Sequence, residues 1–177
     1  SGVSSAIGRA LGAGDHARAT SLAGVAVSIA LIGGALTTSV MLLAGPTVYA
    51  AMGLAGRPVE MAVLYGAVMF GGAIVVWLMN LLANVSRGAG NMMVPAFAIA
   101  IGEAFHLALS PALILGWGPF PALGIVGAAL AAVVAYGVGT IVLVVHLVSR
   151  QALVRLRLGA IRLKREEAAA ILGVGVV

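Results

Sequence analysis

Long stretches without charged residues are the feature that most limits what this chain can fold into. No Asp, Glu, Lys or Arg occurs at positions 20–44, and Glu103 is the only one between positions 88 and 149. Apolar runs beyond about 18 residues are typical of membrane-spanning helices. Charged residues make up 8% of the chain, whereas a soluble domain carries about 25%. The sequence therefore predicts an all-α, polytopic membrane helix bundle.

The apolar runs divide the chain into four complete spans, at 20–44, 59–85, 93–115 and 122–148. Residues 1–14 are interpreted as the end of a helix already under way, since SSAIGRALGAG runs into glycines that stop helices. A basic, partly amphipathic linker at 149–167 is expected to lie along the lipid headgroups, and 168–177 begin another apolar helix. Ten residues rise about 15 Å, half of the hydrocarbon thickness. We therefore expect an excerpt of a larger membrane protein.

Basic residues fall unevenly on the two sides of these spans. Arg57 is alone on one side, and by the positive-inside rule the other side is cytoplasmic. The cytoplasmic set is Arg9, Arg18, Arg87, Arg150, Arg155, Arg157, Arg162, Lys164 and Arg165. The net charge is +5, and six of the ten basic residues lie between positions 150 and 165. This clustering favours a membrane-flanking loop over nucleic-acid binding.

An acid, an imidazole and a hydroxyl lie within the apolar run 93–115. Glu103, His106 and Ser110 are spaced i, i+3, i+7, so they fall within about a 60° arc of one helix face. An ionisable group in lipid needs a partner or a function, which predicts an ion-coupling or substrate-binding site here. The alternative is structural: a protonated acid and a neutral histidine joining helices, with the serine bonded to its own backbone.

Two other helices contribute polar candidates for the same site. Asn80, Asn84 and Arg87 are spaced i, i+4, i+7 on the span 59–85, and Tyr136 lies on the span 122–148. The asparagines are predicted to line an inner vestibule and Tyr136 to face the same cavity. Hydrogen bonding or packing between helices is the alternative. Arg87 is expected to anchor the cytoplasmic end. The chain has no cysteine, so a thiolate metal site is excluded, and no metal site is predicted.

Three segments together resemble the MATE (multidrug and toxic compound extrusion) family: AIGRALGAGDHARA, SRGAGNMMVP and SPALILGWGPFPALGIVGAALA. The resemblance implies twelve transmembrane helices in two related six-helix lobes. This chain would supply the end of the second helix, the third to sixth helices, and the start of the seventh. The stretch 150–165 would then link the lobes.

The resemblance also implies a function. Such proteins are secondary antiporters and not enzymes, and we expect this chain to belong to a multi-pass protein of a bacterial or archaeal cell membrane. They export organic cations and other amphiphiles in exchange for protons or sodium ions by alternating access. The expected partners are membrane lipid, a small organic substrate and the missing helices of the same protein, with no nucleic acid. No cofactor is expected beyond the coupling ion.

One departure from the family pattern bears on the coupling site. Where members often have Asn and Asp in N-x-x-x-D-P, this chain has His106 and Ser110 before Pro111. Either Glu103 has taken over ion coupling, or coupling rests on the missing first helix. A flippase for lipid-linked precursors, of the same broad superfamily, is the alternative function. It is less favoured because a pyrophosphate needs several cations in the cavity, and all basic residues but Arg57 are expected on the cytoplasmic side.

Overall fold

The computed structural model describes residues 2–53, 56–149, 151–156 and 165–172. Within them the regular elements are helices, which confirms the predicted all-α bundle. They are α1 (Gly2–Gly12), α2 (His16–Ala51), α3 (Arg57–Gly71), α4 (Ala73–Gly88), α5 (Met93–Leu115), α6 (Ile125–Val148) and α7 (Arg165–Leu172). Three helices, α2, α5 and α6, are long and apolar enough to cross a membrane, and α3 with α4 makes a fourth, bent span.

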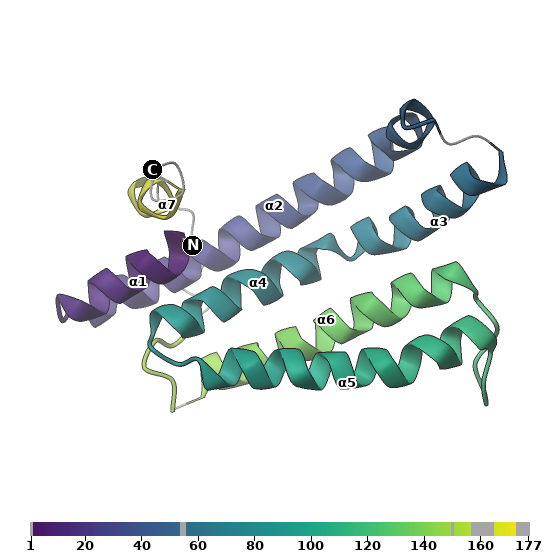
Figure 1. Ribbon diagram of the computed structural model, residues 1–177. Helices are drawn as coiled ribbons and strands as arrows, with labels where there is room; N and C mark the ends of the chain where they lie inside the picture. The colour runs from purple at the N-terminus through teal and green to yellow at the C-terminus, as the bar shows by residue number, and fades with distance from the viewer. Residues whose placement is uncertain (1, 54–55, 150, 157–164, 173–177) are drawn as a thin grey trace.

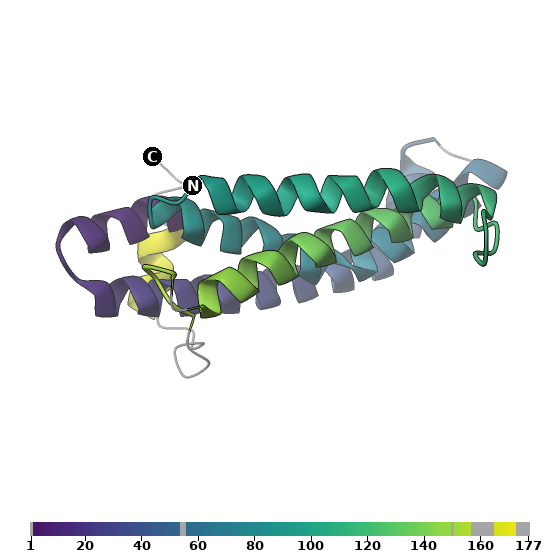
Figure 2. The same cartoon turned by 90° about the horizontal axis from the view of Figure 1, so that it is seen from below.

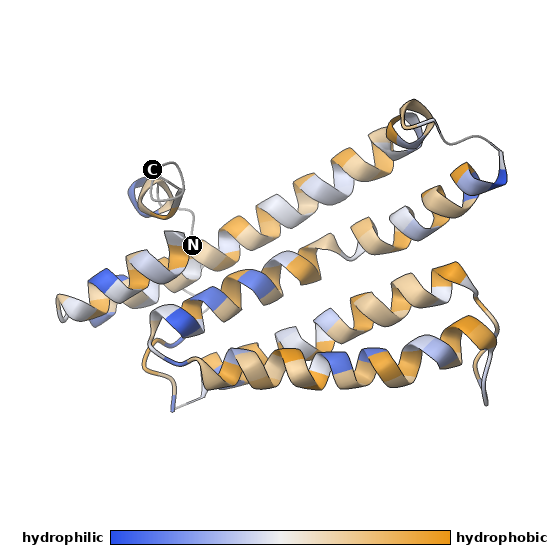
Figure 3. Cartoon of the chain, in the orientation of Figure 1, coloured by the Kyte–Doolittle hydropathy of each residue, from blue (hydrophilic) through white to orange (hydrophobic). Residues whose placement is uncertain are grey.

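The long helices run side by side, with their connecting turns at the two ends of the bundle (Figures 1 and 2). α4 packs between α2 and α6, and α5 packs mainly against α6. α1 contacts α2, α4 and α7 where α2 begins. Three arginines lie at the end of the bundle where α2 begins: Arg9 in the last turn of α1, Arg18 in the first turn of α2 and Arg87 in the last turn of α4. We call this the basic end. Arg57 begins α3 at the opposite end. Hydrophobic residues dominate the spans, with hydrophilic ones on α4 and the middle of α5 (Figure 3).

The first complete span is longer than predicted. The sequence predicted 20–44, whereas α2 contains 36 residues and continues through Pro46 to Ala51. It begins early because Asp15 caps it: the Arg18 amide donates to Asp15 Oδ1 at 2.8 Å. It ends late because Tyr49 packs onto Gly66 of α3, which holds the last turns of α2 in place.

The second span, predicted as one helix at 59–85, is broken into α3 and α4 at Gly72 with a bend of 47°. Glycine favours such a break because it costs a helix about 1 kcal/mol relative to alanine. Two threonines from other helices contact carbonyl groups beside the break. Thr38 Oγ1 donates to Phe70 O at 2.6 Å. Thr140 Oγ1 shares its proton between Tyr136 O of its own helix, at 2.8 Å, and Val75 O, at 3.3 Å. Backbone groups in a membrane need such partners, so the bend is held by hydrogen bonds from α2 and α6.

The predicted linker at 149–167 and the apolar start at 168–177 lie partly outside the described residues, because positions 150, 157–164 and 173–177 are not described. Within the described part, α7 begins at Arg165, three residues earlier than the predicted start. Its Glu167 accepts a hydrogen bond from Ser21 of α2 at 2.7 Å. This bond ties the start of α7 to the basic end of the bundle.

Glycines let α5 and α6 approach one another closely. A Cβ on Gly102 would lie 2.8 Å from Ala135 O, and one on Gly127 would lie 2.5 Å from Leu113 O. Small residues at such contacts let helix backbones pack in van der Waals contact. Because Gly102 faces α6, the next residue, Glu103, is rotated by about 100° to the side. The packing of Gly102 against α6 therefore fixes the direction in which the Glu103 side chain leaves α5.

The α5–α6 contact predicts different results for two glycines of α6. Gly127→Ala places a methyl group against Leu113 O, and we expect it to destabilise the full-length protein by about 1–3 kcal/mol through overpacking. At Gly137 a Cβ would be 4.0 Å from the nearest side-chain atom, so Gly137→Ala should leave stability unchanged or raise it. Thermal unfolding in detergent, followed by circular dichroism, measures both. Equal unfolding temperatures for the two variants would contradict this packing.

Candidate functional site

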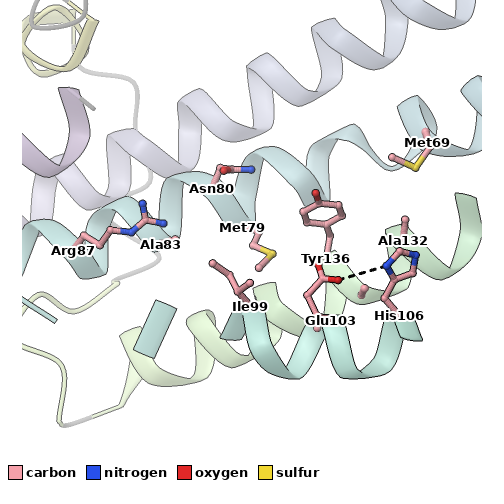
Figure 4. Close-up of a pocket in the computed structure, with 12 residues that line it drawn as sticks. Met69, Met79, Asn80, Ala83, Arg87, Ile99, Glu103, His106, Ala132 and Tyr136 are labelled. Atoms are coloured by element: carbon pink, nitrogen blue, oxygen red, sulfur yellow. Dashed lines mark ion pairs between the residues drawn. The ribbon is translucent and has the colours of Figure 1, made fainter. Parts of the chain in front are cut away.

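A cavity of about 410 Å³ lies between α4, α5 and α6, with one residue of α3 at its edge (Figure 4). Four of the six predicted site residues line it: Asn80 from α4, Glu103 and His106 from α5, and Tyr136 from α6. The remaining lining residues are Met69, Met79, Ala83, Arg87, Ile99, Gly102, Ala132 and Ala135. The three spans therefore bring their polar positions to one place.

Glu103 and His106 form the ionisable pair of the cavity. His106 Nδ1 lies 3.6 Å from Glu103 Oε2, and the side chains are 36% and 63% exposed, respectively (Figure 4). The spacing i, i+3 on α5 produces this contact, because residues one turn apart lie on the same helix face. A protonated imidazole pairs with the carboxylate, whereas a neutral one leaves the carboxylate free to attract another cation. The pair is thus suited to exchange a proton for a cation.

The asparagines of α4 differ in position. Both side-chain amides donate at 2.9 Å to the carbonyl four residues earlier, Asn80 to Val76 and Asn84 to Asn80. Asn80 lines the cavity, and its side-chain oxygen accepts no hydrogen bond from the described residues. Asn84 does not line this cavity, and its place in an inner vestibule stays a prediction. It is turned toward Arg87, whose Nη1 donates to Asn84 Oδ1 at 3.4 Å.

Ser110 is also absent from the cavity lining, which differs from the predicted three-residue stripe. Ser110 lies on the same face of α5 as Glu103, but it is too far along the helix axis to reach the cavity. Seven residues of α5 rise about 10.5 Å from Glu103 to Ser110, and the cavity ends at His106, where Met69 and Ala132 line it.

Sequence reasoning missed two kinds of lining residue. Arg87 was expected only to anchor a helix end, although its i+7 spacing from Asn80 places it on the same face. Met69 and Met79 carried no polar signal, and Met69 reaches the cavity from the far side of the Gly72 break. Methionine is flexible and polarisable, and it is common at surfaces that bind varied ligands. Among the described residues no group of three or more acidic or histidine side chains could hold a metal ion.

The MatE family profile matches residues 1–112. The chain is 29% identical over 159 residues to the probable multidrug resistance protein YoeA of Bacillus subtilis, covering 85% of this chain and 33% of that protein. It is 28% identical over 174 residues to the probable multidrug resistance protein NorM of Thermotoga maritima, covering 98% and 37%. A solved inward-facing multidrug resistance MATE family transporter of the MOP superfamily superimposes with a TM-score of 0.90 at 32% identity, over 99% of this chain and 39% of that one.

The different positions of the two asparagines lead to a test of the cavity. In full-length protein without other cysteines, we expect Asn80→Cys to react with a water-soluble maleimide several times faster than Asn84→Cys. Both substitutions remove a hydrogen bond to the carbonyl four residues earlier, and Asn84→Cys also removes the acceptor of Arg87. The rate of labelling is measured from the mass shift that the maleimide adds. The two variants should react at equal rates when unfolded, which is the reference for their intrinsic reactivity. Equal rates in the folded protein would mean that the cavity does not reach Asn80.

Proposed function

Because this chain belongs to the MatE family, we propose that the full-length protein is a secondary antiporter that exports organic cations and other amphiphiles in exchange for protons or sodium ions. The three sequence motifs predicted this family correctly. Its members are integral, multi-pass membrane transporters and not enzymes, and their solved structures are two-lobe, twelve-helix bundles. The chain spans 33% to 37% of the length of these curated relatives.

The observation that supports ion coupling is the Glu103–His106 pair in the cavity wall. When the pair is protonated, imidazolium and carboxylate satisfy each other or the carboxyl is neutral, and an organic cation gains little by binding there. When the proton leaves, the carboxylate attracts the cation. The two lobes open the site to one membrane face and then to the other. If the site binds the organic cation at one face and the coupling ion at the other, each cycle exchanges the two.

The other walls of the cavity indicate an amphiphilic substrate. Met69, Met79 and the ring of Tyr136 supply apolar contact, and Asn80 supplies a hydrogen-bond acceptor. The volume of about 410 Å³ is within the range of about 300–1,000 Å³ of small-molecule sites. Flexible methionines adapt to molecules of different shape, as a broad-specificity exporter requires.

The flippase alternative receives little support from this cavity. A lipid-linked pyrophosphate carries several negative charges and needs several cations to replace its water. Among the described residues that line the cavity, Arg87 is the one arginine or lysine, and its guanidinium donates to Asn84. An organic cation that faces Glu103 is the better match.

The coupling proposal predicts the effect of Glu103→Gln in the full-length protein. In proteoliposomes loaded with a fluorescent organic cation, we expect an imposed proton or sodium gradient to drive efflux by the wild type. The variant should lose about tenfold or more of this rate, because its amide cannot exchange a proton. Binding of the cation, measured by fluorescence polarisation, should persist.

Glu60→Gln is the matched control, since Glu60 is exposed in the first turn of α3 and outside the cavity. We expect it to transport at the wild-type rate. If Glu103→Gln also transports at that rate, Glu103 has a structural role and coupling belongs to helices outside this chain. The gradient that drives wild-type efflux identifies the coupling ion.

A further inference from the structure

Helix α7 is attached to one end of the bundle. Among the described elements it packs against α1 and α2 alone, at the basic end (Figures 1 and 2). The helices α4, α5 and α6, which form most of the transport cavity, pack against one another and not against α7. A displacement of α7 would therefore leave the contacts between these three helices unchanged.

The polar part of this attachment is one hydrogen bond between residues 146 positions apart. Ser21 Oγ of α2 donates to Glu167 Oε2 of α7 at 2.7 Å. Both side chains are half-buried, and they lie at the end of the bundle. Water can reach both groups when they separate, and it can then replace each partner. The bond can therefore form and break without leaving a buried polar group unsatisfied.

The apolar part of the attachment is small and closely fitted. Ile171 of α7 is 6% exposed, and Ala168 packs against the same hydrophobic core. Gly2 of α1 lies against the backbone carbonyl of Ile171, so a Cβ at position 2 would not fit. Small residues at such a contact let two helix backbones meet. The surface of α1 and α2 around Gly2 and Ser21, which we call the α7 seat, thus fixes one position of α7.

A local contact of this kind matches a requirement of alternating access. A two-lobe exporter opens its cavity to one membrane face at a time by rocking one lobe against the other. The family resemblance implies that α7 begins the second lobe. A contact between the lobes at the basic end closes that end, and it must break when the end opens. The α5–α6 contact cannot serve this purpose, because its separation would take the cavity apart.

We propose that the Ser21–Glu167 hydrogen bond is a latch between the two lobes. It forms when the transport cavity is closed toward the basic end, and it breaks when α7 leaves its seat and the cavity opens there. This inference rests on the proposed function, since it assigns these residues to the access cycle of that transporter. Ser21 and Glu167 are positioning residues that do not contact the exported cation.

The test measures the distance between α7 and its seat in the full-length protein without other cysteines. Spin labels are placed at two exposed positions, Ala13→Cys in the α1–α2 turn and Ala169→Cys in α7. Double electron–electron resonance in nanodiscs should then give two distances for the wild type. The shorter distance corresponds to the seated α7 and the longer one to the open basic end.

Substitutions on either side of the bond should change the ratio of the two populations. Ser21→Ala and Glu167→Ala should each raise the ratio of long to short distances about three- to tenfold, the value of one hydrogen bond. Glu167→Gln keeps an oxygen that accepts from Ser21, so it should change the ratio less than Glu167→Ala.

The chain offers a matched control for each side. Ser28, on the same helix as Ser21, donates to Gly24 O of its own helix at 3.2 Å. Glu166 is exposed and adjacent to Glu167 in the first turn of α7. Ser28→Ala and Glu166→Ala should leave the ratio at its wild-type value. If they raise it as much as Ser21→Ala and Glu167→Ala do, the effect is a general loss of packing and the latch is refuted.

A single short distance in the wild type, with and without organic cation and with either proton or sodium gradients, would also overturn the proposal, because α7 would then be fixed permanently. The distances are measured without transport. A wild type that shows both distances but exports no cation would therefore refute the proposed function and not the latch.

Discussion

The close approach of α5 to α6 determines where the polar groups of the transport cavity point. Gly102 and Gly127 allow the two backbones to meet, and neither position has space for a Cβ. With the Gly102 face fixed against α6, the helix repeat turns Glu103 and His106 toward α4 and the cavity. Asn80 and Tyr136 reach the same space from α4 and α6. A helix rotated by one residue would turn this acid away from the cavity.

Hydrogen bonding to backbone carbonyls explains most of the other polar side chains. Thr38 and Thr140 bond to carbonyls beside the break at Gly72, and the amide groups of Asn80 and Asn84 bond within α4. Such groups stabilise a bundle that has no water to satisfy its backbone. What distinguishes the Glu103–His106 pair is that its two ionisable side chains contact each other and both line a cavity.

The break at Gly72 connects fold and function. It lets Met69 of α3 reach the cavity that is otherwise built by α4, α5 and α6. The bend is supported from two sides, by hydroxyl groups of α2 and α6. One helix pair therefore carries both the bend and part of the cavity wall.

The sequence by itself determined the class of protein, the apolar spans, the family and four of the residues that line the cavity. These follow from local composition and helical spacing, which place Glu103 and His106 on one face without any knowledge of neighbouring helices. Tertiary structure decided which members of each stripe reach the cavity. Ser110 lies too far along α5, and Asn84 is turned toward Arg87. Both outcomes depend on distances between segments, which sequence spacing does not fix.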